Sequence, residues 1–163
     1  MGWSRWSGRA EERVQLIDSE GQPTVESPQV LLEIVCEALI LQDEAEAVLV
    51  AVSRHDHLGN VAPRGGPVGR RFLALQERLP ARYADPQLDR LRANVSTILY
   101  HHAVQVATAL EFLAVDGRSE RLHRQVSEWG DLGLAARSLE EVYQELRGMT
   151  RLSSGTASGL TFG

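Results

Sequence analysis

The sequence contains no lysine, because all 17 of its basic residues are arginines. An all-arginine composition is typical of proteins encoded by GC-rich bacterial genomes. It also excludes two kinds of chemistry, since Schiff-base catalysis and the Walker-type phosphate loop both require a lysine. The protein therefore belongs to neither of these functional classes.

Cysteine is also scarce. Cys36 is the only one in the chain, so no internal disulfide can form and the fold does not depend on oxidation. This usage fits a reducing compartment. The nearest charged residues are the acids Glu33 and Glu37, whereas a nucleophilic cysteine needs basic surroundings. The sequence also lacks a Gly-x-Ser-x-Gly turn, and the prediction therefore leans towards a protein that is not an enzyme.

Long uncharged apolar runs are missing as well. Acidic residues at positions 33, 37 and 43 interrupt the first apolar stretch, and Glu111 interrupts the second. A membrane-spanning helix needs about 20 mostly apolar residues. The opening residues, MGWSRWS, do not form the apolar core of a signal peptide. We therefore expect a soluble, cytoplasmic protein without a transmembrane segment.

The rest of the composition is that of an ordinary globular protein. The chain has 163 residues, of which 43% are hydrophobic and 24% charged, and this predicts one domain with a substantial core. The net charge of −5 argues against a general nucleic-acid binder, because neutralising phosphates requires an excess of cationic residues. We predict no nucleic-acid partner.

Two stretches predict long helices. Ser27-Pro28 and Asp85-Pro86 each place a capping residue before a proline, which is the pattern of a helix start. Apolar residues then recur at helical spacing over about residues 28–55. No glycine or further proline occurs up to about residue 115 in the second stretch. We predict one helix over 28–55 and one over 86–115, with a break near residues 42–44 as an open alternative.

The remaining segments predict shorter elements. Residues 59–69, GNVAPRGGPVG, hold four glycines and two prolines and are expected to form a loop. Short helices are expected before Pro80, over about 119–129, and from a capping box at Ser138 to a stop at Gly148. The predicted fold class is an all-α helical bundle of two long and three short helices.

This reading divides the chain into three parts. They are an N-terminal arm at residues 1–26, a helical domain at 27–150 and a flexible tail at 151–163. The arm is expected to have little structure of its own beyond a short strand over Val14–Ile17 and a turn over Asp18–Gly21. The Gly/Ser/Thr composition of the final residues predicts the mobile tail.

His101 and His102 stand side by side in the second long helix. His101 shares a polar stripe with Thr97 and Thr108, whereas His102 is turned about 100° away, towards apolar neighbours such as Val106. Adjacent residues on a helix do not face each other, so the pair cannot readily bind one metal ion. We interpret His102 as a neutral core histidine held by hydrogen bonds and His101 as a surface residue. In the alternative, His102 is a ligand that points into a pocket between helices.

A metal site is the second hypothesis. Glu120 and His123 match the Glu-x-x-His pattern that supplies two ligands in di-iron bundles, although the pattern occurs here only once. The further carboxylates would come from Glu33 or Glu37, one turn apart. In this alternative the protein is a metal- or small-ligand-binding bundle, with zinc or iron held by His102 and these residues. The preferred prediction is that the protein has no cofactor.

Charge is segregated along the chain. Residues 28–53 carry five acids and no base, whereas residues 54–92 carry eight arginines and four acids. The acidic helix is expected either to pack beside the arginine-rich segment of the same chain or to meet the arginines of a second copy in a two-fold dimer. An ordinary solvated face is the third interpretation. The candidate partner-binding residues are drawn from this pattern and from the arm: Trp3, Trp6, Glu37, Glu44, Arg70 and Arg71.

The stretch 103–115 is apolar around nearly the whole helix circumference, which is typical of a helix central in a bundle or covered by a partner. Together with the charge segregation, this predicts a non-enzymatic helical protein that acts through protein–protein contacts. Its partner would be itself, as a homo-oligomer, or another protein in a larger assembly. The arm and the tail would serve as attachment elements.

Overall fold

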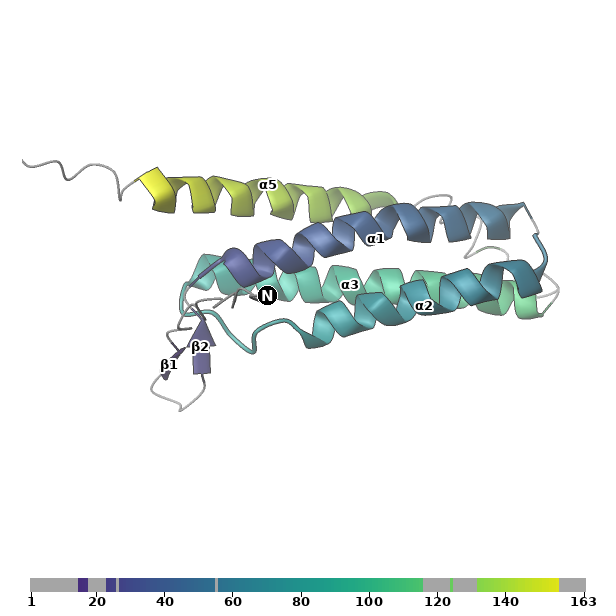
Figure 1. The fold of residues 1–163 in the computed structure, drawn as a ribbon, viewed down its shortest axis with the longest axis horizontal. Coiled ribbons are helices and arrows are strands. Elements are labelled where there is room, and N and C mark those ends of the chain that lie inside the picture. The colour runs from purple at the N-terminus through teal and green to yellow at the C-terminus, as the bar shows by residue number, and fades with distance from the viewer. Residues whose placement is uncertain are drawn as a thin grey trace, which may run out of the picture.

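The structure is a computed structural model, and it describes residues 15–17, 23–25, 27–54, 56–115, 124 and 132–155. Four long helices within these residues lie side by side and run in alternating directions along the molecule (Figure 1). The elements are β1 (Gln15–Ile17), β2 (Pro23–Val25), α1 (Gln29–Ser53), α2 (Leu58–Glu77), α3 (Pro86–Ala114) and α5 (Gly133–Gly155).

The all-α prediction is confirmed for the described residues, apart from two strands of three residues each. β1 and β2 pair antiparallel, with Leu16 opposite Thr24. The strand predicted over Val14–Ile17 is confirmed for its last three residues. The turn predicted over Asp18–Gly21 lies outside the described residues. None of the described helices is both long and apolar enough to cross a lipid bilayer.

The core forms where each helix turns one apolar stripe inward, and α3 packs against α1, α2 and α5. The stripes follow the three- and four-residue spacing that places side chains on one helix face. Fully buried members include Leu31, Ala38 and Val52 on α1, Phe72 on α2, Leu99 and Ala109 on α3, and Leu139 and Leu146 on α5.

The predicted start after Asp85 is present with Asp85 as the cap, whereas α1 begins at Gln29, one residue later than predicted, with Pro28 rather than Ser27 at the N-cap. The Ser27 hydroxyl accepts a hydrogen bond from the Gln29 backbone N–H at 3.3 Å, and Asp85 Oδ1 accepts one from the Leu88 backbone N–H at 2.8 Å. Each bond satisfies an amide that has no partner within the first helical turn. α1 then continues without interruption to Ser53, so the alternative of a break near residues 42–44 is wrong.

The loop predicted over residues 59–69 is wrong, because this segment forms the first part of α2. The buried positions Val61, Gly65, Val68, Phe72 and Leu75 follow one another at spacings of four, three, four and three. They extend the predicted apolar stripe backwards through the glycines. The expected short helix is therefore a helix of 20 residues.

Close packing explains the glycine at the centre of α2. A Cβ atom at Gly65 would lie 3.0 Å from side-chain atoms of both Leu110 on α3 and Val48 on α1. The two prolines inside the helix, Pro63 and Pro67, are exposed. The carbonyls that lose their helical donors to these prolines belong to exposed residues, where water is available instead. The inward position of Gly65 and the outward positions of both prolines therefore make this composition compatible with a helix.

α5 also differs from the prediction. It begins at Gly133, so Ser138 lies inside the helix and does not cap it. The helix continues past Gly148 to Gly155, and the predicted stop at Gly148 is therefore wrong. The helix predicted over about 119–129 lies outside the described residues, except for Arg124, which is helical.

Candidate functional site

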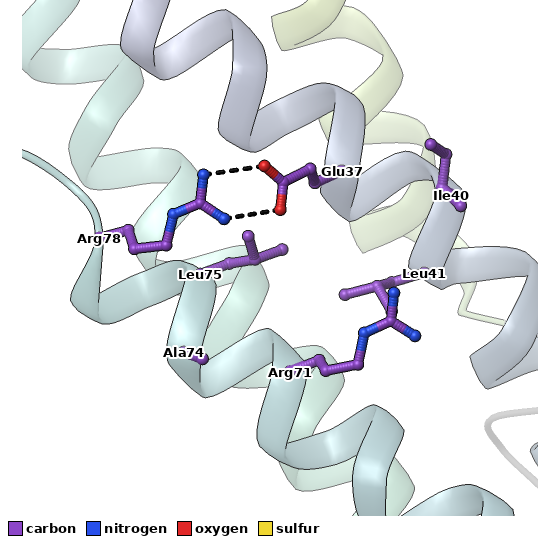
Figure 2. A pocket seen from close by; sticks show the side chains of 7 residues that line it. All are labelled: Glu37, Ile40, Leu41, Arg71, Ala74, Leu75 and Arg78. Carbon is purple, nitrogen blue, oxygen red and sulfur yellow. Dashed lines mark hydrogen bonds and ion pairs between the residues drawn. The ribbon is translucent and has the colours of Figure 1, made fainter. Parts of the chain in front are cut away.

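A small groove lies between α1 and α2 on the surface of the described residues. We call it the α1–α2 groove, and its volume is about 170 Å³. Leu41 and Leu75 extend into the space between the two helices, while Glu37 and Arg78 meet above them (Figure 2). The groove is lined by Glu37, Ile40, Leu41, Arg71, Ala74, Leu75 and Arg78.

Helical spacing builds both walls of this groove. On α1, Glu37, Ile40 and Glu44 follow at three and four residues, and on α2, Arg71, Ala74 and Arg78 do the same. The two rows face each other because the inward stripes of the same helices are buried in the core. Each row thus carries one small or apolar residue between two charged ones.

Two ion pairs connect these rows. Arg78 donates two hydrogen bonds to the Glu37 carboxylate, at 2.6 and 2.8 Å. Arg71 Nη1 contacts both carboxylate oxygens of Glu44 at 2.9 Å. The hydrogen bonds that Arg78 donates lower the pKa of Glu37, and because the Glu37 carboxylate accepts them, the same bonds raise the pKa of Arg78. All four side chains are about half exposed, so water and salt weaken these pairs.

The apolar part of the groove has an unusual exposure pattern. Leu41 and Leu75 are 2% and 3% exposed and form the floor, whereas Ile40 beside them is 64% exposed. Pockets for small organic ligands usually measure about 300–1,000 Å³. The groove is smaller than this range and fits one apolar side chain. An apolar centre with a charged rim is the arrangement found at protein–protein contacts.

The predicted partner-binding residues are brought together only in part. Glu37 and Arg71 line the groove, and Glu44 pairs with Arg71 at its edge. The first interpretation of the charge pattern, pairing within the same chain, is therefore what the structure shows for these residues. Arg70 is exposed on α2 but does not line the groove. Trp3 and Trp6 lie outside the described residues.

Sequence reasoning missed the apolar half of the groove and its second arginine. Ile40 belongs to a long apolar run, and such a run does not show which of its side chains are exposed. Its signal is the helical register: Ile40 falls in the row of Glu37 and Glu44, not in the core stripe of Leu41 and Ala45. Arg78 lies one helical turn after Ala74 and two turns after Arg71. The helical register therefore places it in the same row of α2 as these two residues.

The two histidines occupy the positions that the helical register predicts. His101 is exposed, whereas His102 is fully buried. The Gln42 side-chain amide donates to Nε2 of His102 at 3.0 Å, so Nδ1 carries the proton of the neutral ring. Phe72 packs edge-on against the ring with a centroid distance of 5.1 Å. His102 is thus a polar residue inside the core, held by α1 and α2.

Burial lowers the pKa of His102 to about 4, because an imidazolium would lose its hydration in the core. The nearby Gln105 side chain opposes this shift, and His101 adds to it. Neither His102 Nδ1 nor Gln105 Oε1 makes a hydrogen bond within the part of the chain that the structure describes. The ring therefore stays neutral at physiological pH.

The described members of the hypothetical metal site do not come together. Glu33 and Glu37 are exposed on α1, with Glu33 accepting from Gln29 and Glu37 paired to Arg78, whereas His102 is buried in the core. Among the described residues, no three His, Cys, Asp or Glu side chains are placed to hold a metal ion. Glu120 and His123 lie outside the described residues.

Comparison with known proteins adds no family to this description. No protein-family model, no curated protein and no solved structure matches the chain.

Proposed function

We propose that the protein is a non-enzymatic helical protein–protein interaction subunit that works within an assembly, and that the α1–α2 groove is its partner-binding site. The observation that carries this proposal is the exposure of Ile40 at the edge of a groove that has two buried leucines as its floor and two arginine–glutamate pairs along its sides. Such an apolar centre gains free energy when water is excluded from it, while the charged rim sets orientation and specificity.

The occupant of the groove in this proposal is one apolar side chain of a partner protein. The volume of about 170 Å³ supports a single anchor rather than a whole small molecule. Arg71 and Arg78 are half exposed and keep free donor groups beside their glutamates, so they offer hydrogen bonds to backbone carbonyls that flank the anchor. Cys36 is a free thiol, which fits the proposal of a reducing, cytoplasmic location.

Native mass spectrometry of untagged protein from the cells that make it tests this proposal. Wild type is compared with Ile40→Asp and with Leu134→Asp, since Leu134 on α5 is 78% exposed and lies far from the groove residues in the sequence. We expect wild type and Leu134→Asp to retain a bound partner protein and Ile40→Asp to lose it. If all three proteins retain the same partner mass, or if none retains any, the groove is not the binding site. A retained zinc or iron mass would support the metal-binding alternative.

A further inference from the structure

A second exposed surface lies on α3, away from the α1–α2 groove. The row Ala93, Thr97, Tyr100, Val104 and Ala107 follows the alternating four- and three-residue spacing of a coiled-coil seam, and every member is exposed. We call it the α3 outer row. Tyr100 is 57% exposed and Val104 is 38% exposed. No Asp, Glu, Arg or Lys occurs anywhere from Ala93 to Leu110.

The local contacts make this row more apolar than its composition suggests. The Thr97 hydroxyl donates to the backbone oxygen of Ala93 at 3.1 Å, so its hydrogen bond is satisfied on its own helix. Leu73 adds to the same side of the molecule. It lies on α2 one turn from Gly69 and from Gln76, which pack against Val106 and Ser96 of α3, and it is 40% exposed.

Residues of opposite charge flank the two ends of the row. Arg90 precedes it by one turn and has a side chain that is 73% exposed, with a long contact of 3.9 Å to Glu145. Glu111 follows Ala107 by one turn and is exposed. A second copy of α3 in antiparallel orientation would bring Arg90 of each copy towards Glu111 of the other. A parallel copy would place like charges together, which costs free energy.

We propose that the α3 outer row is the contact between two copies of this chain, arranged as an antiparallel, two-fold symmetric pair. Placing Tyr100 level with Val104 of the second copy also sets Thr97 level with Ala107. Arg90 then lies within one helical turn of Glu111 at both ends. The same patch is used by both copies, so the interaction closes as a dimer. The charge complementarity selects a second copy as the occupant.

The proposed contact is modest in size. From Arg90 to Glu111 the seam is about 32 Å long, at a rise of about 1.5 Å per residue. A single helix from each copy gives an interface at the small end of specific contacts, where complexes are weak and reversible, so dimerisation is expected at micromolar concentrations. This proposal goes beyond the groove, since no groove residue belongs to α3.

Sedimentation velocity on the untagged protein from about 1 to 300 µM, a range that brackets a micromolar dissociation constant, tests the dimer. Wild type is expected to change from monomer to dimer over this range. Val104→Asp should weaken dimerisation at least about tenfold, because it places a carboxylate at the centre of a desolvated contact. Leu134→Asp, an equal change on α5, should dimerise as wild type does. A monomeric wild type, or a Val104→Asp protein that dimerises normally, overturns the proposal.

Charge exchange tests the orientation. Arg90→Glu and Glu111→Arg should each weaken dimerisation, and the double variant should restore it, because opposite charges meet again only in the antiparallel arrangement. A double variant no better than the single ones overturns this register. Ile40→Asp should leave the dimer intact, so the proposal for the groove and the proposal for the α3 outer row are tested independently. Circular dichroism of each variant at low concentration confirms that the monomer is folded.

Discussion

The two faces of α3 differ less in composition than in environment. The inner face buries Leu99 and Val106, yet it also buries His102 and Gln105. The outer face exposes Tyr100 and Val104 to solvent, although it holds no charged residue across its middle. Apolar character alone therefore does not decide which side of this helix is covered. The inner side is covered because α1, α2 and α5 all pack against it.

The nearly uncharged α3 helix serves two purposes with its two faces. On the inner face a polar residue is tolerated because a neighbouring helix supplies a partner, as Gln42 does for His102. On the outer face apolar residues stay in water at a cost in free energy, which burial against another molecule would remove. The core and the proposed interface are thus two uses of one periodic pattern.

The largest expected difference between the two faces is in their contribution to stability. Leu99→Ala should lower the free energy of unfolding by about 3–5 kcal/mol, because it leaves a cavity in the packed core. Tyr100→Ala, on the adjacent residue, should change it by less than about 0.5 kcal/mol in dilute monomer. Urea denaturation at low protein concentration measures both values. Similar losses for the two variants would show that the outer face is also covered.

The next largest effect concerns His102 and acid. Its pKa is about 4 in the folded protein and about 6.5 when exposed, so the folded state favours the neutral ring. The resulting stability is fully present above pH 6.5 and is lost as the pH falls towards 4. The free energy of unfolding should fall by an amount on the order of 3 kcal/mol, since each unit of pKa difference corresponds to about 1.36 kcal/mol.

Urea denaturation between pH 7 and 4 measures this effect. His102→Gln should show a smaller loss of stability over this range than wild type, because the titrating group is gone. His101→Gln, the exposed neighbour, provides the control and should keep most of the wild-type loss, because burial is the main cause of the His102 shift and His101 only a smaller one. If His102→Gln loses as much stability as wild type on acidification, His102 does not titrate as its buried position requires.

The smallest expected effects on stability come from substituting two glycines, Gly65, which is packed against other helices, and Gly148, which is not. Gly65→Ala should lower the free energy of unfolding by about 1 kcal/mol. Overpacking costs about 1–3 kcal/mol, and the higher helix propensity of alanine offsets about 1 kcal/mol of this cost. Gly148→Ala should stabilise it by up to about 1 kcal/mol, because nothing lies within 4 Å of the added methyl position. Thermal melts show both shifts. A Gly65→Ala protein that melts above wild type would contradict the close contact with Leu110 and Val48.

The elements that local chemistry specifies were predictable. The helices that begin at Gln29, after Ser27-Pro28, and at Pro86, after Asp85, were indicated by start signals and apolar spacing, and both are present. The opposite environments of His101 and His102 also follow from helical geometry alone. These predictions succeed because caps and periodicity act within one or two turns of the chain.

The α1–α2 groove was predictable only in its charges. The segregation of acids and arginines made pairing within the chain one of three open interpretations, and it named Glu37, Glu44 and Arg71 only as partner-binding candidates. The structure pairs Glu44 with Arg71 and Glu37 with Arg78, and adds the exposed Ile40. A contact between residues on two different helices depends on how those helices rotate and slide against each other. The sequence pattern of either helix alone does not contain that information.

The sequence by itself determined an all-α chain, the starts of its two long helices and the inward side of α3. The tertiary structure decided that residues 59–69 are helical, that α5 continues through Gly148 and that Ile40 stays exposed. The physical reason is one of magnitude. Intrinsic propensity disfavours a glycine in a helix by only about 1 kcal/mol. Burying the apolar stripe that includes Val61, Val68 and Phe72 contributes about 1.5–3 kcal/mol for each large side chain.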